Sequence, residues 1–521
     1  MIARKTYLIL INSAITGLIG LISWYFVANH VAKGDVGIVY FALGYLGLFS
    51  FISDMGFGSA HIKKVSEGKD LGRCIGTFAA VKIVLVAIYV GVVLLSLFIW
   101  KNVLHRGFET PQHYYMIFVM LAYIIPMQLG DIGMKTFMAR TEVAIQQIAI
   151  LLSSVFQLGF TIYVVTHIEN IYIFGSTWVF GAIVYFTITT LYLSRLPLKR
   201  PTKEYFSDYF RFALPLLLVA ALSTLPGNID KVMIQFFWNK EEVATYVGGQ
   251  RFPPFLTKLA AGLSLILFPT ISSLHANKKI DTIVTLLRKA ERHTLIVLSP
   301  MVAAMVVLSP YIVVILGDIK YSDSYPVLAV LSLWVLMYSI NVPYTQQIVG
   351  MGRTDIAAKN SILSVSSIVL LNLIFIPKDL SQVTNLLFSR PLSGAYNVKL
   401  LGLGATGAAL ATFLSSIIVA LYLRISSYRL TGHISLPPLK PIIAAGAAGV
   451  LLWKTIPLIQ PVTRYYHLVF YSLLLGGYYL LILILIKGFT REDYRFYMDT
   501  LSPKKLLRYF VEEVKHGLRR G

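Results

Sequence analysis

Eight ionisable residues lie inside long apolar stretches of this sequence. An ionisable side chain surrounded by apolar groups is costly unless it is paired or faces a watery cavity. Residues that carry this cost are candidates for ligand binding or for ion coupling. They are Asp54, Lys82, Asp131, Lys135, Asp230, Lys231, Arg251 and Lys258.

Three of these cations suit an anion that has lost part of its water, such as a diphosphate. Arg251 and Lys258 are seven positions apart, so one continuous helix places them on the same face, about 10 Å apart along the axis. Lys82 lies roughly 12 Å from the inner end of its stretch, at 1.5 Å per helical residue. We therefore assign Arg251, Lys258 and Lys82 to an anion site, although Lys82 is long enough to reach the interface instead.

The acidic residues allow two interpretations. Asp131 and Lys135 are four positions apart on a helix and can neutralise each other, which we favour over ion coupling. Asp230 can pair with a cation on a neighbouring helix or, together with the adjacent Lys231, take part in ion coupling. Asp54, near the end of its stretch, is interpreted as a boundary or packing residue.

Motifs for enzyme chemistry are missing or misplaced. Gly402, Gly404 and Gly407 have the spacing of a dinucleotide-binding loop, but they open an apolar stretch and no carboxylate follows at the required distance. Small residues for close helix packing explain them better. The sequence contains no His-Glu-x-x-His motif and a single cysteine, Cys74. We therefore expect no catalytic site, no metal and no cofactor.

The composition indicates which elements must position these charges. The chain has 521 residues, of which 56% are hydrophobic and only 13% charged, so lipid is its main solvent. Apolar stretches of about 20 residues are long enough to cross a bilayer. We predict an all-α membrane protein with about fourteen spans: 7–28, 36–57, 74–99, 114–138, 143–166, 171–194, 212–237, 243–272, 294–316, 324–350, 360–377, 401–423, 439–456 and 466–486.

The net charge of +22 is distributed unevenly over the loops. With the N-terminus inside, the inner segments hold about three times as many Lys and Arg residues as the outer ones, as the positive-inside rule requires. This predicts a multi-pass protein of the cell membrane, plasma or inner, with both termini cytoplasmic. It also makes anionic lipids, and not nucleic acid, the expected partners. Residues 488–521 read as a basic cytoplasmic tail, in which an amphipathic helix begins at Ser502 and Pro503.

Three stretches carry motifs of a known family. Residues 31–64 read VAKGDVGIVYFALGYLGLFSFISDMGFGSAHIKK, with Gly37, Asp54 and a closing basic pair. Residues 212–274 contain Ile229-Asp230 and the closing Phe268-Pro269, and GATGAALAT opens a later span. Together these stretches resemble the polysaccharide flippases of the multidrug, oligosaccharidyl-lipid and polysaccharide (MOP) exporter superfamily.

The resemblance implies two six-helix lobes, 1–200 and 201–430, around a central cavity, followed by two further helices within 431–487. It implies a non-enzymatic flippase that moves a polyprenyl- or dolichyl-diphosphate oligosaccharide to the outer leaflet by alternating access. Arg251 occupies the place of a cationic cavity residue in such flippases. The expected partners are the lipid-linked oligosaccharide and glycan polymerase or transferase proteins, and nothing demands more than a monomer.

One departure from the family bears on the substrate. The related peptidoglycan-precursor flippases carry arginine in the first helix, whereas Asn12, Asn29 and His30 are the main polar groups here. A peptidoglycan substrate is therefore not expected.

Two other functions remain open. An antiporter for small amphipathic cations would share the twelve-helix plan but needs an acidic site, for which Asp131 and Asp230 are the candidates. A membrane sugar polymerase or ligase normally presents a larger outer loop than 378–400, the longest expected here.

Overall fold

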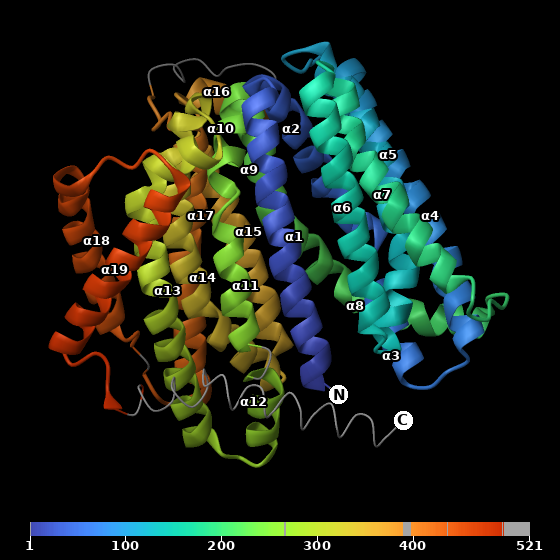
Figure 1. Cartoon of the computed structure of the whole chain (residues 1–521). Helices are drawn as coiled ribbons and strands as arrows, with labels where there is room; N and C mark the ends of the chain where they lie inside the picture. The colour runs from blue at the N-terminus through green and yellow to red at the C-terminus, as the bar shows by residue number, and fades with distance from the viewer. Residues whose placement is uncertain (1, 265–266, 389–397, 435, 492, 494–521) are drawn as a thin grey trace.

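The computed structural model is a bundle of α-helices and describes residues 2–264, 267–388, 398–434, 436–491 and 493 (Figure 1). Within these residues the only extended pairing is an isolated bridge between Asp379 and Lys399. Twelve of the described helices are long and apolar enough to cross a membrane. The protein is therefore all-α and multi-pass, as predicted.

The N-terminal lobe lies on the right of Figure 1, with α1 at its border. A 3₁₀ turn at Ser50–Ser53 connects its second helix to a short helix that does not cross the membrane. The fourth helix continues into a π-helical turn, Ile99–Val103. The helices are α1 (Ile2–His30), α2 (Lys33–Phe49), α3 (Phe57–Ser66), α4 (Leu71–Phe98), α5 (Pro111–Ala139), α6 (Val143–His167) and α7 (Ile171–Leu193).

The second lobe begins with interrupted helices. The spans predicted at 212–237 and 243–272 are not among these twelve, and neither is a single helix. Prolines explain both interruptions, because proline lacks a backbone N–H and disfavours a helical residue before it. Pro226 starts one new helix and Pro253 another. The segments are α8 (Lys203–Thr224), α9 (Pro226–Phe237), α10 (Lys240–Gln250), α11 (Pro253–Ser264) and α12 (Leu267–Ala276).

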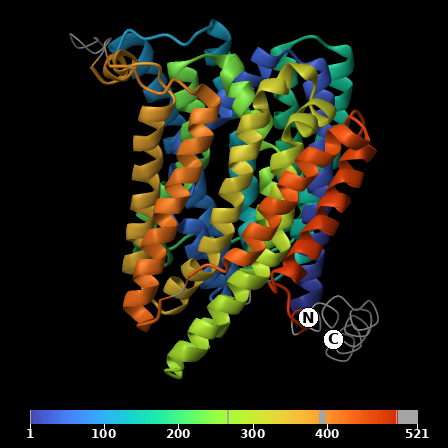
Figure 2. The same ribbon diagram turned by 90° about the vertical axis from the view of Figure 1, so that its left-hand side faces the viewer.

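The remaining helices of this lobe include the longest one. Helix α13 has 37 residues, about 55 Å at 1.5 Å per residue, so it extends beyond a hydrocarbon core of roughly 30 Å. Figure 2 shows its first turns projecting from the lower end of the bundle. The helices are α13 (Ile280–Leu316), α14 (Tyr325–Gly350), α15 (Thr354–Phe375), α16 (Leu380–Phe388) and α17 (Gly404–Thr431).

The last two helices, α18 (Leu439–Ile459) and α19 (Tyr465–Leu485), lie at the left edge of Figure 1. They form a separate apolar core with α13, to which Ala448 and Leu475 contribute. The Tyr479 hydroxyl donates a hydrogen bond of 2.9 Å to the Ile296 carbonyl in α13. The amphipathic helix predicted from Ser502 lies outside the described residues.

Candidate functional site

Arg251 lies at the interruption between α10 and α11. Helix α10 ends before Phe252 and the two prolines that follow it. The Arg251 side chain extends from this interruption toward α1 and α2. Its guanidinium carbon lies 5.0 Å from the centre of the Trp24 ring and 4.5 Å from that of the Tyr40 ring. A planar guanidinium between two aromatic faces is held by cation–π attraction. Two aromatic residues of the N-terminal lobe thus position a cation of the second lobe.

A small cavity of about 160 Å³ lies in front of Arg251. Helices α1, α2, α6 and α7 supply its other walls, which combine aromatic rings with hydroxyl and amide groups. In the described part of the chain, the Nε atom of Arg251 is buried and has no hydrogen-bond partner. The site is therefore cationic, aromatic and equipped with neutral polar groups. The polar lining residues are Thr16, Ser23, Ser154 and Gln157, and Trp178 adds a third ring.

Lys258 does not share a helix with Arg251, so the expected common helix face is wrong. The helix is interrupted after Arg251, and Lys258 belongs to α11. Its side chain is exposed. Lys258 is still a second cation close to Arg251 in the chain. The distance of about 10 Å expected between the two residues along one helix axis does not apply, because they are on different helices.

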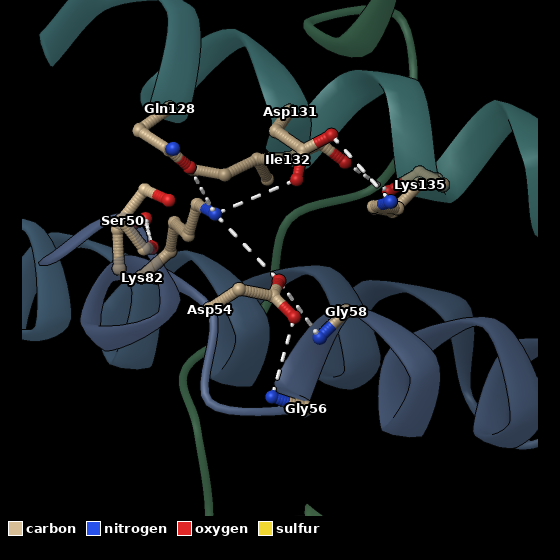
Figure 3. Close-up of polar contacts among 11 residues, drawn as sticks. Ser50, Asp54, Gly56, Gly58, Lys82, Gln128, Asp131, Ile132 and Lys135 are labelled. Carbon is tan, nitrogen blue, oxygen red and sulfur yellow. Dashed lines mark hydrogen bonds and ion pairs between the residues drawn. The ribbon is translucent and has the colours of Figure 1, made fainter. Parts of the chain in front are cut away.

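Lys82, Asp131 and Lys135 come together in the N-terminal lobe with Asp54, as Figure 3 shows. Lys82 is fully buried, and its Nζ donates to Gln128 Oε1 at 2.8 Å. It lies 3.4 Å from Asp131 Oδ2 and 3.7 Å from Asp54 Oδ1. Lys135 approaches the other oxygen of Asp131 at 3.9 Å. Two lysines and two carboxylates neutralise each other, so the geometry at Lys82 favours ion pairing over binding of an external anion.

Asp54 has a defined structural role in this cluster. Its carboxylate accepts hydrogen bonds from the backbone N–H groups of Gly56 and Gly58 at the start of α3. The preceding turn is sharp, because Met55 and Gly56 both have positive φ angles of 45° and 84°, a region that glycine tolerates and most residues avoid. Asp54 thereby connects the first turn of α3 to Lys82 in α4.

The side chains of Asp230 and Lys231 have different hydrogen-bond partners. The Asp230 carboxylate is 1% exposed and accepts hydrogen bonds from the Tyr246 hydroxyl at 2.6 Å and from Asn372 at 2.7 Å. The Thr412 hydroxyl adds a third at 3.2 Å. Lys231 donates instead to the Gly227 carbonyl of its own helix. These three hydrogen bonds to Asp230 therefore all come from neutral donors.

A second buried ion pair was not predicted from the sequence. Glu291 in α13 is paired with Arg424 in α17, and the Tyr344 hydroxyl donates to Glu291 at 2.9 Å. Both charged residues lie within three positions of a predicted span boundary, so they were assigned to loops. In the structure α13 begins earlier and α17 ends later, at Ile280 and Thr431.

Polar contacts join the two lobes at the end of the bundle opposite to the start of α1. Lys33 Nζ lies 2.7 Å from Asp323 Oδ1, and Asn29 donates to the Gly317 carbonyl at 2.9 Å. Helices α2 and α10 approach so closely that a Cβ atom on Gly37 would lie 1.8 Å from the Lys240 carbonyl oxygen. The structure is therefore closed at this end.

Solved structures of low sequence identity share this fold. The lipid II flippase MurJ in an inward closed conformation superposes with a TM-score of 0.68 at 16% identity, covering 94% of this chain and 99% of that one. An inward-facing multidrug resistance MATE family transporter of the MOP superfamily gives 0.58 at 13% identity, covering 81% and 96%. A MOP superfamily transporter from Pyrococcus furiosus, whose binding pocket is described as reversed in polarity, gives 0.56 at 13% identity, covering 83% and 95%.

Comparison of the sequence identifies the family more specifically than the shared fold does. An uncharacterized membrane protein of Methanocaldococcus jannaschii is 22% identical over 178 residues, which span about a third of each chain, 34% of this one and 35% of the relative. The model of the family described as polysaccharide biosynthesis protein matches residues 2–275, more than half of the sequence. The chain belongs to this polysaccharide biosynthesis protein family.

Proposed function

We propose that the protein is a flippase that moves a polyprenyl- or dolichyl-diphosphate oligosaccharide from the cytoplasmic to the outer leaflet by alternating access. The observation that carries the proposal is Arg251, a cation with an unpaired Nε at the interface of two lobes. A diphosphate that enters the membrane interior loses water and needs such a donor. The membership in a polysaccharide biosynthesis family supports the same substrate class.

The closed end of the bundle suggests the side from which the substrate enters in the transport cycle. Substrate would enter between the lobes from the cytoplasmic side, where we expect the basic loops and both termini from the positive-inside rule. Its diphosphate would bind Arg251, with Lys258 as the second cation, and the lipid tail would stay in the bilayer. Release would then require the contacts of Lys33 with Asp323 and of Asn29 with Gly317 to break.

The other intramembrane charges have supporting roles in this proposal. Lys82 and Lys135 together with Asp131 and Asp54 form a neutral cluster that we assign to the stability of the N-terminal lobe. Asp230 is the candidate for ion coupling, because a buried carboxylate that is surrounded by neutral oxygen and amide groups can accept a proton or a monovalent cation.

Asp230 also favours a second candidate function, an ion-coupled antiporter of small amphipathic molecules. Such a protein would bind its substrate without a diphosphate. Arg251 argues against this alternative, because an unpaired arginine repels organic cations.

Leaflet transfer in proteoliposomes tests the proposal. A fluorescent polyprenyl-diphosphate oligosaccharide would be supplied to wild type and to the Arg251→Ala, Arg251→Lys and Lys258→Ala variants. We expect Arg251→Ala to abolish transfer and Arg251→Lys to restore it only in part, because an ammonium does not stack as a guanidinium does. Arg429→Ala is the matched control, since Arg429 is exposed on α17.

Two results would overturn the proposal. One is unchanged transfer by a folded Arg251→Ala variant. The other is no transfer by folded wild type over several glycans and imposed ion gradients, with export of an organic cation instead.

A further inference from the structure

A larger cavity lies inside the second lobe. Its volume is about 710 Å³, and its walls come from α9 to α12 and from α14, α15 and α17. Gln250 lines this cavity, whereas the next residue, Arg251, lines the small cavity between the lobes. The two cavities are thus lined by consecutive residues of the chain, which makes the larger one the candidate for the part of a ligand that lies beyond Arg251.

The lining of this cavity is neutral and amphipathic. Among the described lining residues there is no Asp, Glu, Lys or Arg. Trp334 and Tyr338 of α14 form an aromatic surface with ring centres 5.6 Å apart. The amides of Gln346 in α14, Gln250 in α10 and Asn360 in α15 also line the cavity. Aromatic faces with amide and hydroxyl groups around them suit ligands that combine C–H surfaces with hydroxyl groups.

Two acceptors in the wall have no hydrogen-bond partner among the described residues. Asn341 is 7% exposed, and its Nδ2 donates to the Ser416 carbonyl at 3.1 Å, but its Oδ1 is buried without a hydrogen bond. The Oδ1 of Asn360 is likewise unpaired. An unsatisfied buried acceptor costs about 1–3 kcal/mol. A ligand that brings hydroxyl donors would remove this cost.

Charge discriminates between ligands at this site. Tyr246 and Thr412 line the cavity and also bind the Asp230 carboxylate behind them. An anionic group in the cavity would find no counter-ion and would approach the carboxylate of Asp230. A buried charge without a partner is unfavourable, so the lining selects uncharged groups.

We propose that this cavity is the glycan subsite of the transporter and that it takes an uncharged oligosaccharide of a few sugars. The volume lies within the range of roughly 300–1,000 Å³ that is usual for ligand sites, which limits the enclosed portion to a short chain. The proposal rests on the flippase function, because the diphosphate at Arg251 is what places the sugars here.

The test compares glycans on one lipid carrier. Proteoliposomes would receive a polyprenyl diphosphate that carries one neutral hexose, a neutral tetrasaccharide, or a tetrasaccharide in which one hexose is a uronic acid. We expect wild type to transfer both neutral substrates and to transfer the uronate about tenfold more slowly, equivalent to about 1.4 kcal/mol. The Gln346→Lys variant should narrow this difference, and Gln346→Glu should widen it.

Trp334 is the second probe. Trp334→Ala should slow transfer of the tetrasaccharide about tenfold and leave the monosaccharide unchanged, whereas Trp334→Phe should retain most activity because it keeps a ring. Trp453→Ala is the matched control, because Trp453 is 66% exposed on α18. Thermal unfolding of each variant would identify any that fail to fold.

The outcomes separate the subsite from the flippase. If wild type transfers the substrates but Trp334→Ala affects all of them equally, or if the uronate moves as fast as the neutral glycan, the subsite is wrong and the flippase stands. If wild type transfers none of them, the flippase fails. Binding of the free neutral tetrasaccharide would then still support the cavity as a sugar site. It would be measured as quenching of tryptophan fluorescence, and the Trp334→Phe variant should not show this quenching. Binding of a neutral aromatic drug but not of the sugar would overturn it.

Discussion

The Lys82 ammonium in α4 lies 3.4 Å from the Asp131 carboxylate in α5, within a cluster that contains as many acids as lysines. Removing the cation from such a cluster leaves carboxylates unpaired in a low-dielectric environment, which is strongly destabilising. We expect Lys82→Met to lower the free energy of unfolding by about 2 kcal/mol, less than for a fully buried pair because both acids are partly exposed. Thermal unfolding in detergent measures this.

The double variant Lys82→Met with Asp131→Asn should recover part of the loss. Lys454→Met is the control, because Lys454 is exposed on α18. The opposite pattern, full stability of Lys82→Met with loss of transfer, would contradict the assignment and return Lys82 to the anion site.

There is a physical reason why the sequence predicts the spans but not the contacts of this cluster. Hydropathy predicted most spans to within a few residues, as for 143–166 against Val143–His167, because apolar length is a local property of the chain. It also predicted that Lys82 and Asp131 lie within membrane spans. The partners of Lys82, however, come from two other segments, α5 and the turn before α3, and one sequence carries no signal for their contact.

Two other features do have a signal in the sequence. Pro253 and Pro254 in succession indicate a helix interruption next to Arg251. Glu291 and Arg424 carry opposite charges next to predicted boundaries, and helices commonly continue past the apolar region. The aromatic contacts of Arg251 with Trp24 and Tyr40 have no such signal, since these residues are more than two hundred positions away.

The Glu291 pair gives the second prediction. The Glu291 side chain is fully buried and bound by Arg424 and Tyr344. Glu291→Ala should lower the free energy of unfolding by about 3–5 kcal/mol, the usual cost of removing one partner of a buried pair. A double variant with Arg424→Met should be less destabilised than the sum of the two single variants. Additive losses, measured against the exposed Glu204→Ala as control, would show that the pair is not coupled.

Gly37 gives a third prediction, about the closed end of the bundle. A Cβ atom there would overlap the Lys240 carbonyl oxygen, at 1.8 Å, so α2 and α10 could not keep their contact. Gly37→Ala should therefore shift the protein away from the closed arrangement and expose Lys33 and Asp323. Reactivity of a cysteine at position 33 with a membrane-impermeant reagent would rise several-fold.

The control for this variant is Gly20→Ala, because nothing lies within 4 Å of a Cβ atom at Gly20. Cys74 is buried and should not react. Equal labelling of the Gly37→Ala and Gly20→Ala proteins would mean that the approach of α2 to α10 does not hold this end closed.

His61 in α3 leads to a prediction about pH. Its ring is fully buried between the Tyr209 hydroxyl of α8 at 2.9 Å and the Thr136 hydroxyl of α5 at 2.8 Å. Burial lowers the pKa of His61 from its ordinary value of 6.5 to about 3. The imidazole is therefore neutral in the folded protein, whereas in the unfolded chain it takes up a proton below pH 6.5. The contribution of His61 to the free energy of unfolding is then complete above that pH and falls as the pH decreases from 6.5 toward 3, by about 1 kcal/mol for each pH unit.

Melting temperatures of wild type and His61→Gln, measured between pH 7.5 and 5, should converge as the pH falls. The exposed His105→Gln variant should keep the pH dependence of the wild-type melting temperature. Parallel slopes for His61→Gln and wild type would show that other groups cause the loss at acidic pH and that His61 does not link α3 to α8 as a neutral ring.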